Sequence, residues 1–408
     1  MGEENSFLTA TYLVSGVGDF YKRAEKIALG LTVGTWTGLS MEEKDKLIKH
    51  LGKVEEVQVL PGDEQGQGKA LLTISFPVLN VTPDFPSLLT TIFGKGSMDG
   101  KIRLVDVTLP EGLRREFPGP KFGIEGIRNL LGVYDRPLLM SIFKQCIGLN
   151  LEELNKEYQS QLEGGVDLIK DDEIFFQDDE APAIQRVRSF EEKNRRHYEK
   201  TGKKVLYAVN LTGPVTQLAD QAKRLIDAGA SCLLLNVFSY GLDVLHQLAA
   251  DPNIQVPLMA HPAVAGALYQ SPDYGIASPL LFGKFLRWAG ADFVLYPSPY
   301  GSVALPEKEA LQIAQHLRQT DRIHRDAFPV PSAGIHPGLT PLLFEDFGLD
   351  FIVNAGGGIH GHEEGSAAGG RAFLHAIEAI VSGYTLEEAS NYSPELKQAI
   401  KQWGVHSR

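Results

Sequence analysis

Four consecutive polar residues follow an apolar run near the middle of the chain, and their side chains could bind a metal. They are Lys170, Asp171, Asp172 and Glu173, at the end of the run Gly165–Lys170. Alternation along an extended chain points Lys170 and Asp172 to the same side. Carboxylate oxygens in this pattern indicate a Mg²⁺ site, and a solvated acidic turn is the alternative. A lysine suits a metal site only if its amine is neutral or is converted to an acid, for example by CO₂ as a carbamate.

Glycine is enriched, and part of the excess lies at the ends of two apolar runs. The chain has 42 glycines in 408 residues, where average usage would give about 29. Ser332–Gly334 and Gly356–Gly358 each follow an apolar run. Backbone N–H groups in such segments can hold a phosphate. Glycines that only form tight turns are the alternative.

Three histidines also lie at or near such ends. His261 follows an apolar run and could bind substrate or a carbonyl oxygen, while a structural histidine is the alternative. His360 and His362 lie two residues apart in the glycine-rich segment. No cysteine or third ligand accompanies them, so a zinc site is not expected.

A repeating pattern of strand and helix must position these residues. Apolar, β-branched runs without alternation predict parallel strands buried on both faces. Eight such runs occur at Leu138–Phe143, Gly165–Lys170, Val205–Asn210, Cys232–Val237, Val256–Ala260, Asp292–Tyr296, Phe328–Ser332 and Asp350–Asn354. Helical patterns lie between them, including Leu151–Glu163, Val215–Ala228 and Glu307–Arg318.

Eight such units over roughly 270 residues predict an α/β fold, a (β/α)₈ barrel, whose typical length is about 250 residues. A doubly wound open sheet is the alternative, but the count of eight and the lack of a strong dinucleotide fingerprint favour the barrel. Catalytic residues of such barrels lie at the C-terminal ends of the strands. The polar and glycine-rich segments described above occupy these ends.

The first 130 residues differ from the rest of the chain. Strand-like runs mix there with helical patterns, which predicts a separate α+β domain, of ferredoxin-like type. The expected strands are Phe7–Val14, Val54–Leu60, Ala70–Pro77 and Ile102–Leu109, and the expected helices are Asp19–Leu29 and Pro86–Phe93. We therefore expect an N-terminal domain over residues 1–130 and the barrel over residues 131–408.

Composition excludes several classes of protein. The chain has 39 Lys+Arg against 51 Asp+Glu, a net charge of −12, which argues against coating nucleic acid or an anionic membrane. It has no run of about 18 apolar residues, and its acidic start, Met1–Asn5, is unlike a signal peptide. The two cysteines, Cys146 and Cys232, lie in apolar surroundings where reduced thiols are expected. We expect a cytoplasmic protein with neither a nucleic-acid nor a membrane partner.

At the residues described so far, the sequence resembles the RuBisCO superfamily. The matching stretches are Gly34–Thr37, Arg136–Leu139, Gly164–Glu173, Ser332–His336 and Gly356–Gly358. In this family the lysine of the acidic segment is carbamylated by CO₂, and the carbamate binds Mg²⁺ with the second aspartate and the glutamate. The resemblance therefore implies one Mg²⁺ held by Lys170, Asp172 and Glu173, with Lys170 as N6-carboxylysine.

Departures from the family separate this chain from the carboxylases. The carboxylases have a mobile-loop lysine where this chain has Tyr300–Val303, and a glutamate where it has Gly30–Val33. Thr91 replaces an asparagine, and Cys146 replaces one of two lysines, of which Lys144 remains. The resemblance thus implies enolisation without CO₂ fixation.

The departures resemble one subgroup, the RuBisCO-like enolases of methionine salvage. The similar stretches are Phe93–Lys95, Pro118–Gly123, Leu139–Lys144, Val209–Gly213, Met259–Pro262, Pro297–Ser302 and Asn354–His362. These isomerases convert 2,3-diketo-5-methylthiopentyl-1-phosphate to 2-hydroxy-3-keto-5-methylthiopentenyl-1-phosphate. Their general base corresponds to Lys95 and reaches the barrel of the partner subunit, which implies a homodimer with shared active sites.

The resemblance also implies a set of substrate contacts. Expected contacts with the phosphorylated diketone are Lys144, Lys170, Asp171, Asp172, Glu173, His261, Ser332, Gly334, Gly356 and Gly357. Two other functions stay open at this point. One is a different RuBisCO-like sugar-phosphate isomerase with the same metal site, and the other is a non-catalytic regulatory protein.

Overall fold

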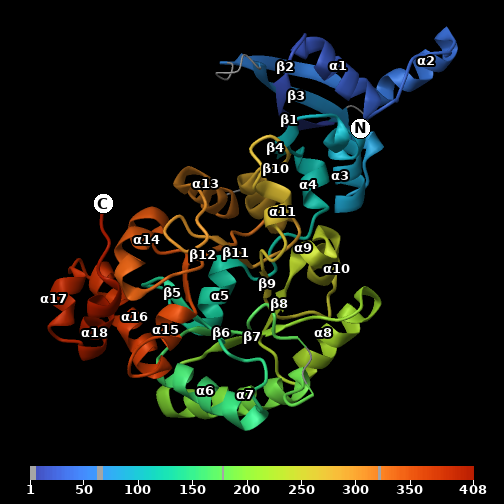
Figure 1. Ribbon diagram of the computed structural model, residues 1–408. Helices are drawn as coiled ribbons and strands as arrows, with labels where there is room; N and C mark the ends of the chain where they lie inside the picture. The colour runs from blue at the N-terminus through green and yellow to red at the C-terminus, as the bar shows by residue number, and fades with distance from the viewer. Residues whose placement is uncertain (1–5, 62–67, 177–178, 320–322) are drawn as a thin grey trace.

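Two sheets organise the chain, and each belongs to a different part of the molecule. The computed structural model describes residues 6–61, 68–176, 179–319 and 323–408. Figure 1 shows the N-terminal sheet and its helices at the top, with a ring of strands and helices below.

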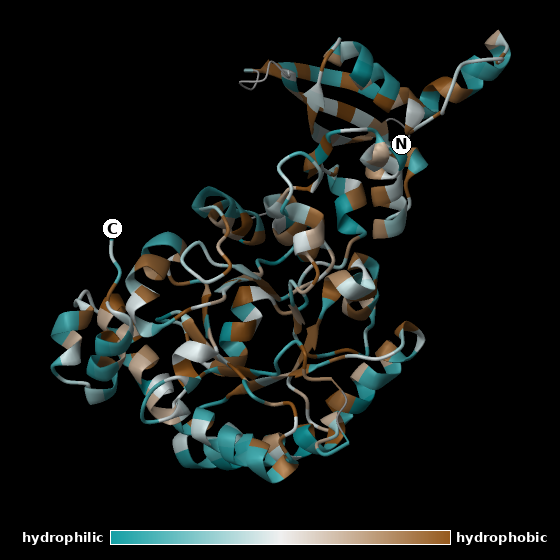
Figure 2. Ribbon diagram, in the orientation of Figure 1, coloured by the Kyte–Doolittle hydropathy of each residue, from teal (hydrophilic) through white to brown (hydrophobic). Residues whose placement is uncertain are grey.

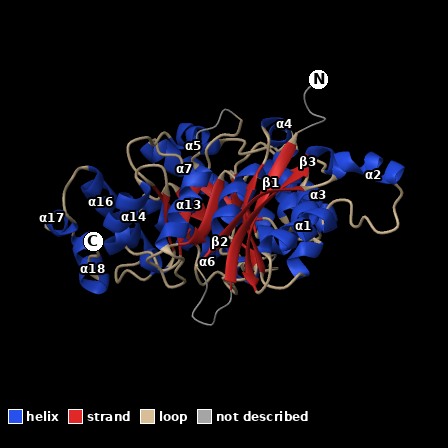
Figure 3. Ribbon diagram, turned by 90° about the horizontal axis from the view of Figure 1, so that it is seen from above, coloured by secondary structure: helices blue, strands red, loops and turns tan. Residues whose placement is uncertain are grey.

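The N-terminal part has the expected α+β arrangement. Its elements are β1 (Phe7–Gly16), α1 (Phe20–Gly30), α2 (Met41–Leu47), β2 (Lys53–Leu60), β3 (Gly68–Pro77), α3 (Phe85–Phe93) and β4 (Ile102–Thr108). The strands pair antiparallel in the order β4-β1-β3-β2. With α2 as an insertion, this β-α-β-β-α-β order confirms the ferredoxin-like prediction. Viewed from above, the strands of this sheet lie in front of the barrel (Figure 3).

A fifth strand joins this sheet from the barrel half of the chain, which the sequence pattern did not predict. β10 (Gly275–Ile276) pairs parallel with β4, and Ala277 N donates to Leu104 O at 2.8 Å. The ammonium group of Lys284 contacts Asp106 at 2.6 Å. Phe85 of α3 packs against Phe285 with ring centroids 5.8 Å apart. The two parts are therefore joined by backbone, charged and aromatic contacts.

The second sheet is the predicted barrel. Its eight parallel strands are β5 (Leu138–Ile142), β6 (Leu168–Lys170), β7 (Leu206–Asn210), β8 (Cys232–Leu235), β9 (Leu258–Ala260), β11 (Phe293–Pro297), β12 (Phe328–Ser332) and β13 (Ile352–Ala355). The order runs from β12 through β11, β9, β8, β7, β6 and β5 to β13. β12 and β13 lie side by side, and Asn354 Nδ2 donates to Ser332 Oγ across them at 2.8 Å. This nearly closed ring excludes the open doubly wound sheet.

Helices lie between and after the strands of the barrel. They are α6 (Leu151–Glu163), α7 (Ala183–Thr201), α8 (Leu218–Asp227), α9 (Val237–Tyr240), α10 (Leu242–Ala250), α11 (Gly266–Tyr269), α12 (Leu286–Trp288), α13 (Glu307–Leu317), α14 (Thr340–Phe347), α15 (Gly357–His360), α16 (Ser366–Val381), α17 (Leu386–Ser390) and α18 (Pro394–Trp403). Their outer faces carry most of the hydrophilic colour in Figure 2, and the strands inside are mainly hydrophobic. Sequence reasoning did not identify α7.

Several element boundaries differ from the expected ones for local reasons. The second strand of the barrel starts at Leu168 rather than Gly165, because Gly165 has φ +75° and forms a turn. The helix expected from Val215 begins as a 3₁₀ turn over Val215–Gln217 before α8. α6 begins at its predicted cap, where Asn150 and Glu153 form a capping box.

Apolar side chains fill the barrel interior in alternation along each strand. The buried interior cluster contains Leu138, Met140, Leu168, Leu206, Ala208, Cys232, Leu234, Met259, Phe293, Leu295, Phe328, Val330 and Ile352. α5 (Gly123–Leu131) adds Ile124, Ile127 and Leu131 to this cluster. The division at residue 130 stays a prediction, and the packing of α5 leads us to propose that the barrel unit begins at Gly123.

Two further features concern the whole chain. Both cysteines are free and buried. Among the residues that the structure describes, no helix combines the length and apolar character that a membrane crossing requires.

Candidate active site

Polar residues occupy the barrel interior where the strands end. Because side chains alternate along a strand, residues two positions beyond the apolar interior layer also point inward. At the C-terminal ends, this inward set consists of Lys170, Asn210, Asn236, His261, Ser332 and Asn354. The same alternation that builds the core therefore brings polar groups from six strands to one end of the barrel.

Lys170 is a fully buried lysine at the end of β6. Its side chain has no exposed surface, and its Nζ donates to Asp171 O at 2.8 Å. Burial lowers the pKa of Lys170 to about 8, although the nearby carboxylates oppose this change. About a tenth of this amine is thus neutral at pH 7, and the neutral form is the nucleophile that can react with CO₂.

Four of the candidate residues, Lys144, Asp172, Glu173 and His261, lie around this lysine. The ammonium group of Lys144 forms an ion pair with Asp172 Oδ2. Burial would raise the pKa of Asp172, but the hydrogen bond from Lys144 and the positive charges of Lys144 and Lys170 together outweigh it and lower that pKa. His261 Nε2 lies 3.5 Å from Glu173 Oε2, and burial lowers the pKa of His261 well below its usual value. The histidine is therefore neutral beside these carboxyl groups.

Two asparagines that the sequence analysis did not select complete this cluster. Asn210 and Asn236 donate their Nδ2 groups to Glu173 O at 3.1 and 2.9 Å. Both side-chain Oδ1 atoms are buried without a hydrogen-bond partner among the described residues. The sequence feature that could have indicated them is an asparagine at or near the end of the third and fourth apolar runs.

The donor set of this cluster fits Mg²⁺ under one condition. Asp172 and Glu173 supply hard carboxylate oxygens, and the unpartnered Oδ1 atoms of Asn210 and Asn236 supply two more candidate ligands. Within the described residues, no group of three or more His, Cys, Asp or Glu could hold a metal. Carbamylation would turn Lys170 into a third acidic ligand, so the residues fit Mg²⁺ when Lys170 carries CO₂.

Asp171 points away from this cluster. Its Oδ2 accepts from Arg186 Nη2 at 2.9 Å and from Asn210 N at 3.0 Å, and its Oδ1 accepts from Tyr207 OH at 2.6 Å. Both Asp171 and Arg186 have no exposed side-chain surface. The contact of Asp171 with substrate stays a prediction, and its carboxylate is engaged on the outer side of the sheet.

The glycine-rich segments are packed backbone to backbone. Ala333 and Gly334 have φ of 74° and 72°. A Cβ at Gly334 would lie 2.7 Å from Ser302 N, and one at Gly358 would lie 2.2 Å from Ile335 O. The segments after β11, β12 and β13 therefore converge at one place. Phosphate binding by Ser332, Gly334, Gly356 and Gly357 stays a prediction.

Lys144 connects this place to the polar residues around Lys170. A Cβ on Gly356 would lie 2.7 Å from Lys144 Cε, so the lysine side chain passes directly over this glycine. Its ammonium group contacts Asp172. A substrate that spans the cluster and the glycine-rich segments would contact Lys144 between its two ends.

His360 and His362 make structural contacts. His360 Nε2 lies 2.8 Å from Ile142 O, and His362 Nε2 lies 3.0 Å from Glu395 O. Each ring therefore joins the segment after β13 to a neighbouring element.

Lys95 lies apart from the barrel residues in the same chain. It begins the 3₁₀ turn Lys95–Met98 after α3 and is exposed. It lines a cavity of about 360 Å³ formed by residues of 26–34 and 95–99. The role of Lys95 as base stays a prediction, and this chain alone does not bring it to Lys170.

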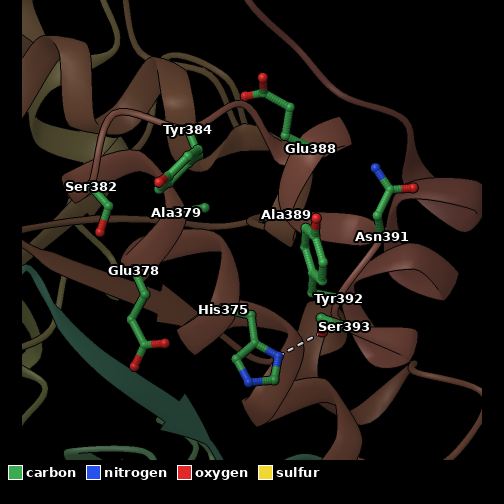
Figure 4. A pocket seen from close by; sticks show the side chains of 10 residues that line it. All are labelled: His375, Glu378, Ala379, Ser382, Tyr384, Glu388, Ala389, Asn391, Tyr392 and Ser393. Atoms are coloured by element: carbon green, nitrogen blue, oxygen red, sulfur yellow. Dashed lines mark hydrogen bonds between the residues drawn. The ribbon is translucent and has the colours of Figure 1, made fainter.

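A larger hollow, of about 650 Å³, lies on the C-terminal helices α16–α18 (Figure 4). Tyr384, Tyr392 and Glu378 line it, and His375 Nδ1 lies 2.6 Å from Ser393 Oγ. None of the predicted site residues lines this hollow. Cavity size therefore does not locate the predicted active site in this molecule.

Comparisons with known proteins agree with the fold. The family described as ribulose bisphosphate carboxylase large chain, catalytic domain, matches residues 123–302 and 309–403. The crystal structure of a rubisco-like protein from Alicyclobacillus acidocaldarius is 51% identical, with a TM-score of 0.93 over 98% of this chain and 100% of the other. Octameric RuBisCO from Pyrococcus horikoshii is 29% identical, with a TM-score of 0.90 over 99% and 95%. The chain belongs to the RuBisCO large-chain family.

Similarity within this family identifies a narrower group. The 2,3-diketo-5-methylthiopentyl-1-phosphate enolase of Geobacillus thermodenitrificans is 53% identical over 407 residues, which cover 98% of both chains. This confirms the predicted resemblance to RuBisCO-like enolases.

Proposed function

We propose that this protein is an isomerase that converts 2,3-diketo-5-methylthiopentyl-1-phosphate to 2-hydroxy-3-keto-5-methylthiopentenyl-1-phosphate in methionine salvage. The observation that carries the proposal is the buried Lys170 beside Asp172 and Glu173, in a chain 53% identical over its length to an enolase of this name. The same similarity disfavours another sugar-phosphate isomerase and a regulatory protein.

Carbamylation of Lys170 would prepare the site. The neutral Nζ attacks the carbon of CO₂, an N–C bond forms, and one C=O electron pair moves to oxygen. The nitrogen releases one proton, so the product is an anionic carbamate. Burial favours the neutral amine, and Asp171 O holds its Nζ at 2.8 Å.

The carbamate, Asp172 and Glu173 would then hold one Mg²⁺. When bound, Mg²⁺ polarises the carbonyl oxygens of the substrate and stabilises developing negative charge. Asn210 and Asn236 orient Glu173 through its carbonyl oxygen. Lys144 and the neutral His261 would contact the diketone, and Ser332, Gly334, Gly356 and Gly357 would hold its phosphate.

Lys95 would act as the base. Its neutral amine takes a proton from C1, and the C–H electron pair becomes the C1–C2 double bond. The π electron pair of the C2 carbonyl moves to its oxygen, which is then protonated. Substrate and product therefore have the same atoms. No lysine lies in Tyr300–Val303 to receive CO₂, and burial raises the pKa of Cys146 to about 11. These features support a reaction without carboxylation.

We further propose a homodimer in which Lys95 of one protomer serves the barrel of its partner. Lys95 is exposed, and α2, which projects from the molecule in Figure 1, has no buried residue. A seven-residue helix without packing is unstable in water by itself, so contact with a partner would account for this arm. The octameric relative supports assembly. We place the enzyme in the cytoplasm, with this small phosphate as its partner.

The variant Lys95→Ala tests the assignment of the base. Enolisation is followed by ultraviolet absorbance with the diketo phosphate, and C1 proton exchange is followed by NMR in D₂O. We expect both to be lost while Mn²⁺, used as a probe for Mg²⁺, still binds in bicarbonate. Normal exchange in the variant would contradict the role of Lys95. A wild-type protein that acts on methylthioribulose phosphate and not on the diketone would contradict the proposed function.

A further inference from the structure

A buried ion pair lies directly behind the predicted metal ligands. Asp171 lies between Lys170 and Asp172 in sequence, but its side chain is on the opposite side of the strand. Arg186 of α7 donates to it at 2.9 Å, and neither side chain has exposed surface. Burial lowers the pKa of Arg186, but Asp171 and Tyr207 outweigh this effect, so the guanidinium stays charged.

Arg186 holds the metal-ligand segment at more than one point. Its guanidinium carbon lies 3.8 Å from the centre of the Phe175 ring, and its Nη1 donates to Ala181 O at 2.6 Å. It therefore contacts Asp171 before the ligands Asp172 and Glu173, and Phe175 after them. Phe175 N also donates to Asp172 O at 3.0 Å, which closes this short turn.

The same network reaches the amine of Lys170 and the third strand. Asp171 O accepts from Lys170 Nζ, so the orientation of this peptide group determines where the amine lies. Tyr207 OH and Asn210 N bind the Asp171 carboxylate from β7. The Asn210 side chain in turn binds Glu173 O. The groups that bind the Asp171 carboxylate therefore belong to residues that lie next to the cluster.

We propose that Arg186 is a positioning residue for the metal site, acting through Asp171 and Phe175. It fixes the turn that presents Asp172 and Glu173 and the peptide that holds Lys170 Nζ. This role rests on the proposed function, because it assumes that these residues bind Mg²⁺. It also assigns Asp171 to support of the site rather than to contact with substrate.

The double variant Asp171→Asn with Arg186→Gln tests this role. A single Arg186 variant would leave a buried carboxylate unpaired, which destabilises the fold strongly, whereas the double variant removes both charges together. We expect the Mn²⁺ dissociation constant, measured by EPR titration in bicarbonate, to rise about 10- to 100-fold, the range typical of residues that orient metal ligands. The carbamate signal from ¹³C-bicarbonate should fall in parallel.

The chain offers a matched control at the other end of the same strand. The buried Asp167, just before β6, forms a second ion pair with the partly exposed Arg136, at 2.7 Å. Asp167 Oδ2 also accepts from Leu139 N, so this pair supports backbone as Asp171 does. Asp167→Asn with Arg136→Gln should also lower the melting temperature, but leave the Mn²⁺ dissociation constant and the carbamate signal unchanged.

Tyr207→Phe is the second test, for the case that the double variant does not fold. This change keeps the aromatic ring and removes only the hydroxyl group. It removes one hydrogen bond from Asp171 and should weaken Mn²⁺ binding roughly 3- to 10-fold. Unchanged Mn²⁺ affinity in the Asp171/Arg186 variant, or in Tyr207→Phe, would overturn the role of Arg186. An equal loss in the control pair would overturn it too. A wild-type protein that binds no Mn²⁺ in bicarbonate would contradict the metal site itself and this role with it.

Discussion

At the scale of single residues, burial gives Lys170 its distinctive chemistry. A lysine in water has a pKa near 10.4 and is almost fully protonated at pH 7. With no exposed surface, Lys170 has a pKa lowered to about 8, even though carboxylates lie nearby. Its neighbours Asp172 and Glu173 then need only the added CO₂ to form a three-ligand oxygen site.

This shift predicts a pH dependence for carbamylation of Lys170. Only the neutral amine attacks CO₂, and the lowered pKa means that the neutral fraction rises as pH increases through about 8. At a fixed concentration of dissolved CO₂, the initial rate should therefore increase from pH 7 to 9 and level off above it. Rapid-quench ¹³CO₂ trapping measures this rate. A rate that keeps rising tenfold per pH unit up to pH 10 would show an ordinary lysine.

At the scale of elements, three strand ends are held together by glycines. Gly334 lies against Ser302 N and Gly358 lies against Ile335 O, each too close for a Cβ. Helix α15 starts at Gly357, and its first N–H groups have no intrahelical acceptor. Close approach of the backbones therefore fixes the segment whose amide groups we expect to bind phosphate.

Neighbouring glycines provide a test of this arrangement. Gly358→Ala would put Cβ 2.2 Å from a backbone oxygen, while an added Cβ at Gly357 has no atom within 4 Å. We expect Gly358→Ala to reduce kcat/KM by up to about 100-fold, because the loops must separate. Gly357→Ala keeps its N–H group, and its melting temperature should stay within a few degrees of that of the wild type. Equal kinetics for wild type and Gly358→Ala would contradict the proposed phosphate site.

At the scale of the whole molecule, the N-terminal part is tied to its own barrel. β10 pairs with β4, and Lys284 contacts Asp106. These contacts restrain any swing of the N-terminal part that would carry Lys95 into its own barrel. An exposed Lys95 on a restrained domain supports a base supplied to a partner subunit.

Mixed dimers test the shared site directly. Lys95→Ala and Lys170→Met should each be inactive alone. A heterodimer of the two has one barrel with Lys170 that receives Lys95 from the partner, so equal random mixing should restore about a quarter of wild-type activity. Turnover after co-refolding measures this recovery. If Lys95 serves its own barrel, no mixture would regain activity.

Particular residues show how far sequence reasoning extended. Eight apolar runs predicted the barrel, and the acidic segment at the end of the second run predicted a metal site at Lys170, Asp172 and Glu173. Asn210 and Asn236 were not selected, because a lone amide after a strand has no distinctive spacing. Arg186 was not selected either, since it lies in α7, a helix that sequence reasoning did not identify.

The sequence by itself determined the strand pattern, the family and which side chains end each strand, because local periodicity and motif spacing are properties of consecutive residues. Only the tertiary structure decided which neighbours those side chains meet. It turned Asp171 outward to Arg186, buried Lys170 enough to lower its pKa, and paired β10 with β4. These outcomes depend on burial and on contacts between residues far apart in the chain, and spacing along the sequence does not encode them.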